Sequence, residues 1–169
     1  MAERVDVAVS GGGAVGLSGA RELRLASVDR VVVLEREPSV GQGSSARANG
    51  GVRAQFTTPI NIAFSLHSIV EFESLRDRYG EVLSFHQTGY LFLTGTEEGE
   101  LGLRSAMELQ RSLGVDTRWI EPAEVPALAP IVAVDGLRGA TFHRRDGFLD
   151  PHGTVEVMRL ECRRLGAEV

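Results

Sequence analysis

The chain has 169 residues, of which 43% are apolar and 24% charged, and its formal net charge is −5. This length and composition predict one soluble globular domain with a real core and are too small for two full domains. The negative charge disfavours non-specific nucleic-acid binding, and apolar runs of four residues, such as Val31–Leu34, exclude a membrane span.

The first residues, the single cysteine and the absence of lysine also bear on location and chemistry. Met1–Arg4 leads directly into an apolar run, which leaves no room for a signal peptide, so a cytoplasmic location is expected. A single cysteine, Cys162, excludes an internal disulfide. All 18 basic residues are arginine, which excludes Schiff-base chemistry on lysine and a P-loop lysine within this chain.

The first predicted element is a buried strand that starts at Val5 and ends in a glycine turn. Gly11, Gly13 and Gly16 have the G-x-G-x-x-G spacing of a phosphate-binding turn. The first glycine permits the tight turn, the second lets a pyrophosphate approach the backbone, and the third lets the next helix pack closely. The helix N-terminus then offers unpaired N–H groups to an anion.

The context on the carboxyl side of the turn supports a nucleotide-binding interpretation. A helical stripe of apolar residues follows, and a second strand, Val31–Leu34, ends at Glu35. The stripe comprises Val15, Leu17, Ala20, Leu23, Leu25 and Ala26. Glu35 stands where a carboxylate accepts hydrogen bonds from a ribose. Taken singly, the glycine spacing also occurs in ordinary loops, and Glu35 could be a solvated strand end.

The next segment, Pro38–Gly51, is rich in glycine and serine and replaces the helix that normally follows in NAD-binding domains. One interpretation is a flexible surface loop. The other is that Ser44 and Ser45 open a second helix N-terminus facing the pyrophosphate, while Gly50 and Gly51 let the main chain lie against a flat ring.

The remaining elements follow from periodicity and punctuation by glycine and proline. A long helix is expected from Ile60 to Tyr79, with Ile62, Leu66, Ile69, Val70 and Phe72 facing inward and Gly80 as its stop. After it we expect a strand at Gln87–Thr94, a helix at Glu97–Leu113, a strand at Thr117–Ile120, a short turn at Glu121–Glu124, an irregular stretch around Pro126 and Pro130, a strand at Leu137–His143, a helix from Pro151 to Gly166, and a last strand beginning at Ala167–Val169.

Several single residues invite a functional role that their context does not support. The four histidines lack any ligand spacing, so no metal site is predicted. Cys162 lies in the middle of a helix and is expected to be a structural thiol. Trp119 is expected in the core, and capping or turn formation explains both Asp146 and Asp150.

The motifs SGGGAVG, VVVLERE, GQGSSARANGG, GYLFLT and RRDGFLDPHG, in this order, resemble the amino-terminal part of FAD-dependent oxidoreductases of the D-amino-acid oxidase superfamily. Within it the chain is most similar to the group of sarcosine oxidase β-subunits, dimethylglycine dehydrogenases and amino-acid dehydrogenases. The resemblance implies an α/β fold, in which a Rossmann-like FAD-binding βαβ unit carries an inserted mixed α+β substrate domain.

The resemblance also implies roles for individual residues. Gly11, Gly13, Ala14, Val15 and Gly16 would surround the FAD pyrophosphate, Glu35 would hold the adenosine ribose, and Arg36 would lie near the adenine. A run from the pyrophosphate to the isoalloxazine would comprise Ser44, Ser45, Arg47, Asn49, Gly50 and Gly51. Some members attach flavin through a histidine in this run, and since this chain has Arg47 and no histidine there, non-covalent FAD is expected.

The implied domains are a first part of the FAD-binding domain at 1–82, part of the substrate domain at 83–150, and a helix and strand returning to the FAD-binding domain at 151–169. Members of the superfamily are much longer. The expectation is therefore a fold incomplete at its C-terminus, either a fragment or one piece of a split protein whose flavin domain a second chain completes.

The expected activity is oxidation of the C–N bond of a small amine or amino acid by hydride transfer to FAD. Arg53 and Gln55, just past the glycine pair, are the catalytic candidates near the flavin ring. Two alternatives stay open. One is a non-catalytic or truncated nucleotide-binding subunit, and the other is an NAD(P)-dependent dehydrogenase.

Overall fold

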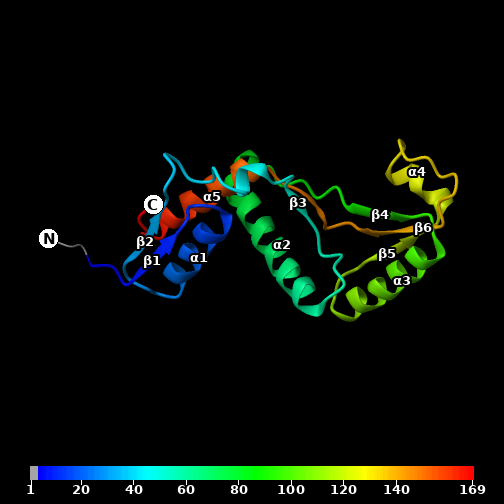
Figure 1. Ribbon diagram of the computed structural model, residues 1–169, viewed down its shortest axis with the longest axis horizontal. Coiled ribbons are helices and arrows are strands. Elements are labelled where there is room, and N and C mark those ends of the chain that lie inside the picture. The colour runs from blue at the N-terminus through cyan, green and yellow to red at the C-terminus, as the bar shows by residue number, and fades with distance from the viewer. Residues whose placement is uncertain (1–3) are drawn as a thin grey trace. The chain divides into compact units, whose positions relative to one another are not determined.

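The computed structural model describes residues 4–169, which pack as two compact units (Figure 1). Unit 1 comprises the described part of Met1–Gly50 together with Leu75–Phe85 and Leu149–Val169. Unit 2 comprises Gly51–Ser74 and His86–Phe148. The expectation about a leader rests on Met1–Glu3, which lies outside the described residues.

The sheet of unit 1 is parallel, and a helix crosses between its two strands. Strand β1 (Val7–Ser10) pairs in parallel with β2 (Val31–Leu34), and α1 (Ala14–Leu25) connects them. Glu168 forms a parallel bridge with Val32, so the chain returns to the free side of β2. The predicted βαβ unit is confirmed, and the last strand begins where the sequence placed it.

Burial in this unit differs from the prediction at both ends of α1. Val15 is 88% exposed and Leu25 is 48% exposed, whereas Leu17 and Ala20 are fully buried. Only one face of α1 meets α5, so residues outside that face stay in solvent. Strand β1 is also half-buried rather than buried, because within the described residues β2 is its only partner.

Helix α5 (Pro151–Arg164) packs against α1 beside the parallel strands (Figure 1). Asp150 caps it, because its carboxylate accepts hydrogen bonds from the backbone N–H groups of His152 and Gly153. Cys162 is fully buried on this helix, and its Sγ donates to the Leu17 carbonyl oxygen at 3.1 Å. Burial raises the pKa of this thiol, which makes it the structural residue that the sequence predicted.

Unit 2 contains two small antiparallel sheets. The larger has the strand order β4-β6-β5, made of β4 (Tyr90–Thr94), β6 (Gly139–His143) and β5 (Arg118–Ile120). The smaller pairs β3 (Gly51–Val52) with β7 (Gly147–Phe148). Helix α3 (Glu97–Ser112) packs against the larger sheet, and Thr96 caps it.

A short helix interrupts a stretch that the sequence analysis expected to be irregular. A 3₁₀ turn at Pro122–Glu124 carries a capping box made by Glu121 and Glu124 and leads into α4 (Val125–Leu128). The expectation for Pro126 was wrong, because a proline in the first turn of a helix loses no hydrogen bond.

Helix α2 (Pro59–Tyr79) begins in unit 2 and ends in unit 1, where a 3₁₀ turn at Gly80–Val82 follows. Ile62, Ile69 and Leu75 are its most buried side chains. Val70 was predicted to face inward but is 54% exposed, because it lies one helical step past Ile69.

The compact units group residues differently from the predicted 1–82 domain. Gly51–Ser74 belongs to unit 2, where Ala54, Ile62, Ile69 and Val115 form one hydrophobic cluster. The units describe packing only, so the division into FAD-binding and substrate-binding residues stays a prediction. Within residues 4–169, no helix combines the length and apolar character needed to cross a membrane.

Candidate functional site

The glycine turn between β1 and α1 requires glycine at two positions. Gly11 has a φ of +100°, a left-handed conformation that side chains disfavour. A Cβ at Gly16 would lie 2.0 Å from the Gly11 carbonyl oxygen, so any side chain there would push the turn open. The first and third glycines are therefore fixed by the turn itself.

The N-terminus of α1 lies at this turn. Gly13 is the N-cap residue and provides no side-chain cap, and the first turn contains no acidic residue. The Ser45 hydroxyl reaches it from the glycine- and serine-rich segment and accepts a hydrogen bond from the Ala14 N–H at 3.1 Å. The helix end therefore keeps its partial positive charge, the feature that binds phosphate groups at such turns.

Glu35 closes the other side of the turn. Its Oε1 accepts from the Glu37 N–H at 3.0 Å, and its Oε2 accepts from the Gly12 N–H at 2.8 Å. These two backbone donors, Glu37 first, hold the pKa of the Glu35 carboxyl below its usual value. Gly12 was not predicted as a site residue, yet a Cβ there would lie 2.7 Å from Val40 Cγ1.

Two cavities meet at Glu35, at the carboxyl ends of β1 and β2. The one beside the turn has a volume of about 470 Å³ and is lined by Ser10, Gly11, Leu34, Glu35 and Arg36. The carboxyl ends of parallel strands are where α/β sheets bind nucleotides.

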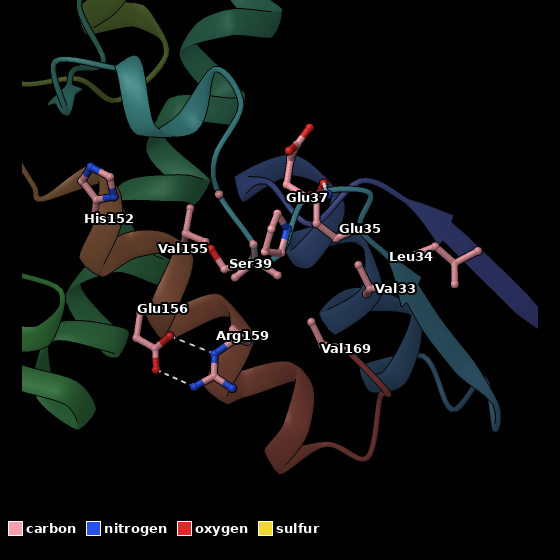
Figure 2. Close-up of a pocket in the computed structure, with 13 residues that line it drawn as sticks. Val33, Leu34, Glu35, Glu37, Ser39, His152, Val155, Glu156, Arg159 and Val169 are labelled. Atoms are coloured by element: carbon pink, nitrogen blue, oxygen red, sulfur yellow. Dashed lines mark hydrogen bonds and ion pairs between the residues drawn. The ribbon is translucent and has the colours of Figure 1, made fainter.

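The larger cavity, of about 630 Å³, lies between the strand ends and α5 (Figure 2). Glu35, Val33 and Val169 line one side of it, and Val155 and Arg159 line the α5 side (Figure 2). Its full lining is Val33, Leu34, Glu35, Glu37, Pro38, Ser39, Val40, Gly41, His152, Val155, Glu156, Arg159 and Val169. The α5 residues were not predicted, because nothing in a helical stripe marks which cavity it faces.

The segment from Ser44 to Gly51 forms less helix than predicted. It contains one 3₁₀ turn, Ser45–Arg47, which is too short to act as a second helix N-terminus. Ser44, Arg47 and Asn49 are exposed.

The glycine pair that ends this segment has two different environments. Gly50 has a φ of +71°, and a Cβ there would lie 2.0 Å from the Leu149 carbonyl oxygen, so backbone packing alone requires glycine. Gly51 is exposed, and only Tyr90 Cε2, at 3.9 Å, lies near a Cβ placed there. Of the two, Gly51 leaves the backbone open to a ligand.

In unit 2, Arg53 is held by aromatic rings. Its guanidinium carbon lies 5.4 Å from the ring centroid of Phe56 and 5.7 Å from those of Tyr90 and Phe92. We call these four residues the Arg53 cage. Within residues 4–169 the guanidinium has no ion-pair or hydrogen-bond partner, and its side-chain contacts of this kind are with the three rings.

The Arg53 cage borders a cavity of about 300 Å³. The lining residues are Gly51, Val52, Arg53, Phe56, Phe64, Ser65, Ser68 and Phe72. A cation at the rim of a mainly apolar cavity suits a small ligand that carries one negative group.

Gln55, the second catalytic candidate, faces the interior of unit 2. Its side chain is 7% exposed, and its Nε2 donates to the Tyr90 carbonyl oxygen at 2.8 Å and to Asp146 Oδ2 at 3.1 Å. The structure thus places the Gln55 amide in a buried network, whereas Arg53, two residues earlier, borders a cavity.

A turn is present where one was expected, since the Asp146 N–H donates to the His143 carbonyl oxygen at 3.4 Å, but capping does not explain the Asp146 side chain. Asp146 is fully buried, and its Oδ1 accepts from the Ala54 N–H at 2.8 Å and lies 2.6 Å from His143 Nδ1. An Asp-Gly pair predicts a turn from local sequence alone. The Asp146 carboxylate, however, accepts hydrogen bonds from residues about 90 positions away, which local sequence does not reveal.

Comparison with known proteins gives one consistent family. The family model described as FAD dependent oxidoreductase matches residues 6–169. The frog (Xenopus laevis) protein named FAD-dependent oxidoreductase domain-containing protein 1 is 30% identical over 97% of this chain and 35% of its own length. Mitochondrial dimethylglycine dehydrogenase of Rattus norvegicus is 29% identical over 97% of this chain and 19% of its own length.

A solved structure gives the same answer for the fold. L-Proline dehydrogenase from P. horikoshii superposes with a TM-score of 0.93 at 30% identity, covering 99% of this chain and 44% of that one. The chain thus spans well under half the length of each protein to which it is compared here.

Proposed function

Since the chain belongs to the family of FAD-dependent oxidoreductases, we propose that it forms the nucleotide-binding part of an enzyme that oxidises the C–N bond of an amine or amino acid. Two similar proteins, dimethylglycine dehydrogenase and L-proline dehydrogenase, are named for substrates of this kind. Because this chain spans only part of them, activity, substrate and any completing chain are all proposed.

The residues of the glycine turn fit the ADP half of FAD. The first turn of α1 contains no acidic residue and its N-cap residue, Gly13, has no side chain, which suits a pyrophosphate, and Gly11 and Gly16 hold the turn in shape. The ionised Glu35 carboxylate lines both neighbouring cavities and can accept hydrogen bonds from ribose hydroxyls. Arg36 lines the cavity beside the glycine turn, where it can face the adenine.

The chain's own residues would bind and orient, and the cofactor would supply the redox chemistry. FAD, when bound, accepts a hydride from the carbon next to the amine nitrogen. The Ser45 hydroxyl, which accepts from the Ala14 N–H, would donate its own proton to the phosphates, and the open backbone at Gly51 would contact the ring. Residues 4–169 contain no cluster of three or more metal-ligating side chains.

Arg53 is the residue through which we propose that the substrate is recognised. Its guanidinium is held over three rings, borders a cavity, and lacks an anionic partner among residues 4–169. A substrate carboxylate would satisfy it with a charge-assisted bidentate hydrogen bond. Gln55 would support this region from the interior rather than contact substrate.

The test is anaerobic mixing of the flavin-loaded protein with primary and secondary amino acids and with amines that lack a carboxylate. Bleaching of the flavin band by an amino acid is expected. Arg53→Gln should raise the amino-acid concentration for half reduction at least tenfold, about 1.4 kcal/mol, without changing reduction by a carboxylate-free amine. Arg118→Gln, which removes a guanidinium over the Phe142 ring, is the matched control.

The other outcomes discriminate the remaining functions. Flavin that stays oxidised with every amine would contradict the oxidation of C–N bonds and favour a non-catalytic nucleotide-binding subunit. Purification with bound NAD(P) in place of FAD would favour a nicotinamide-dependent dehydrogenase and contradict the flavin proposal.

A further inference from the structure

A fully buried carboxylate lies behind the Arg53 cage. Asp146 has no exposed surface, and its Oδ1 accepts from the Ala54 N–H at 2.8 Å and lies 2.6 Å from His143 Nδ1. Its Oδ2 accepts from Gln55 Nε2 at 3.1 Å. Both side-chain oxygens of Asp146 therefore have partners, as buried polar atoms require.

The first link from Asp146 to Arg53 runs through the main chain. Val52 pairs with Gly147 in the small antiparallel sheet, next to Asp146. On the other side of Arg53, the Ala54 N–H donates to the Asp146 carboxylate. The backbone of Arg53 is thus fixed on both sides by the same short segment.

The second link runs to the strand that carries the rings. Gln55 Nε2, besides contacting Asp146, donates to the Tyr90 carbonyl oxygen at 2.8 Å. His143, which contacts the other carboxylate oxygen, is the cross-strand partner of Tyr90 in the β4-β6 pair. Tyr90 and Phe92 lie two residues apart on β4, with ring centroids 5.2 Å apart, and both contact Arg53.

We infer that Asp146 is a positioning residue, which holds the Arg53 guanidinium in place over the rings of Phe56, Tyr90 and Phe92. The guanidinium has no hydrogen bond of its own within residues 4–169, so only its backbone and the rings determine its place. Asp146 fixes both. Residues that contact a ligand keep their geometry through such buried hydrogen-bonded support.

This inference rests on the proposed function only for what Arg53 binds, not for how Arg53 is held. The test therefore needs neither cofactor nor substrate. The Nε–Hε resonance of Arg53 in the whole chain is measured by NMR and assigned by its disappearance in Arg53→Lys. The three ring faces should shift the resonance of this proton away from the chemical shift that exposed arginines show.

Asp146→Asn keeps the size of the side chain but replaces one acceptor by a donor. The new amide then faces the Gln55 amide nitrogen, and Gln55 can turn its unpartnered Oε1 toward it only by giving up its bond to Tyr90. We expect the Arg53 resonance to lose its displacement and move to the position of exposed arginines.

Two further variants decide the outcome. Asp150→Ala removes a carboxylate that caps α5 in unit 1, so it should lower stability and leave the Arg53 resonance in place. Gln55→Met breaks only the link from Asp146 to Tyr90 and should reduce the displacement, even if Asp146→Asn does not fold. If the Arg53 resonance does not move in any folded variant at Asp146 or Gln55, the inference is overturned. Flavin reduction tests the proposed function separately.

Discussion

At the scale of single residues, Glu161 carries the most concentrated set of interactions in unit 1. It is fully buried and forms ion pairs with Arg164 and Arg78, each at 2.9 Å, and with Arg21 at 3.3 Å. Tyr79 Oη donates to the same carboxylate at 2.6 Å. Glu161 therefore joins α1, the end of α2 and α5 around one charge.

Glu161→Gln should destabilise the chain much more than the loss of an exposed ion pair on the same helix. It leaves three guanidinium groups around a neutral amide, and we expect the free energy of unfolding to fall by about 3 kcal/mol. Glu156→Gln removes an ion pair with Arg159, and the Glu156 side chain is 43% exposed. This substitution should lower the free energy of unfolding by less than about 1 kcal/mol. Urea denaturation followed by circular dichroism measures both, and equal losses would show that Glu161 has no special role.

The same residue gives the chain a dependence on acid. Hydrogen bonds, first from Arg164 and then from Tyr79 and the other arginines, hold the pKa of the Glu161 carboxyl well below its ordinary value of 4.5. Its stabilisation is therefore full above pH 4.5, declines below it, and is lost as the pH falls through the lowered pKa of the folded state. Glu161→Gln should flatten this acid limb of the stability profile.

At the scale of elements, the glycine turn and α1 form one structure that depends on a close contact between their backbones. Gly16 belongs to α1, yet its α-carbon faces the Gly11 carbonyl oxygen of the turn. The third glycine thus lets α1 begin after a turn of only three residues from the end of β1. One cavity reaches Gly11 of this turn, and Glu35 lines both that cavity and the larger one.

Gly16→Ala and Gly19→Ala, two changes in the same helix, should have opposite effects. The added methyl at Gly16 would overlap a backbone oxygen 2.0 Å away, so we expect a loss of about 1–3 kcal/mol. At Gly19 nothing lies within 4 Å, and alanine should stabilise the helix by up to about 1 kcal/mol. Thermal unfolding measures the signs, and a stabilising change at Gly16 would contradict the close-contact account.

At the scale of the whole molecule, the order of elements was predictable because it depends on local signals. Alternating valines, glycine turns and caps such as Asp150 and Thr96 act within a few residues. The glycine turn and Glu35 came together for the same reason, since a βαβ unit brings strand ends side by side.

What the sequence could not predict depends on contacts between distant segments. The buried role of Asp146 and the exposure of Val15 both follow from packing partners far along the chain. The larger cavity also depends on which face of α5 meets the strand ends. Cytoplasmic location and non-covalent attachment of FAD stay predictions, and several relatives, the dimethylglycine dehydrogenase of Rattus norvegicus among them, are named as mitochondrial.

The central claim is that this chain binds the ADP half of FAD. Calorimetric titration with FAD, ADP and FMN tests it most directly, because FMN lacks the adenosine half. FAD and ADP should bind, FMN should bind at least tenfold more weakly, a difference of about 1.4 kcal/mol, and Glu35→Gln should weaken FAD and ADP while Glu22→Gln on α1 leaves both unchanged. FMN binding as tight as FAD binding, or ADP binding that is indifferent to Glu35, would contradict the account.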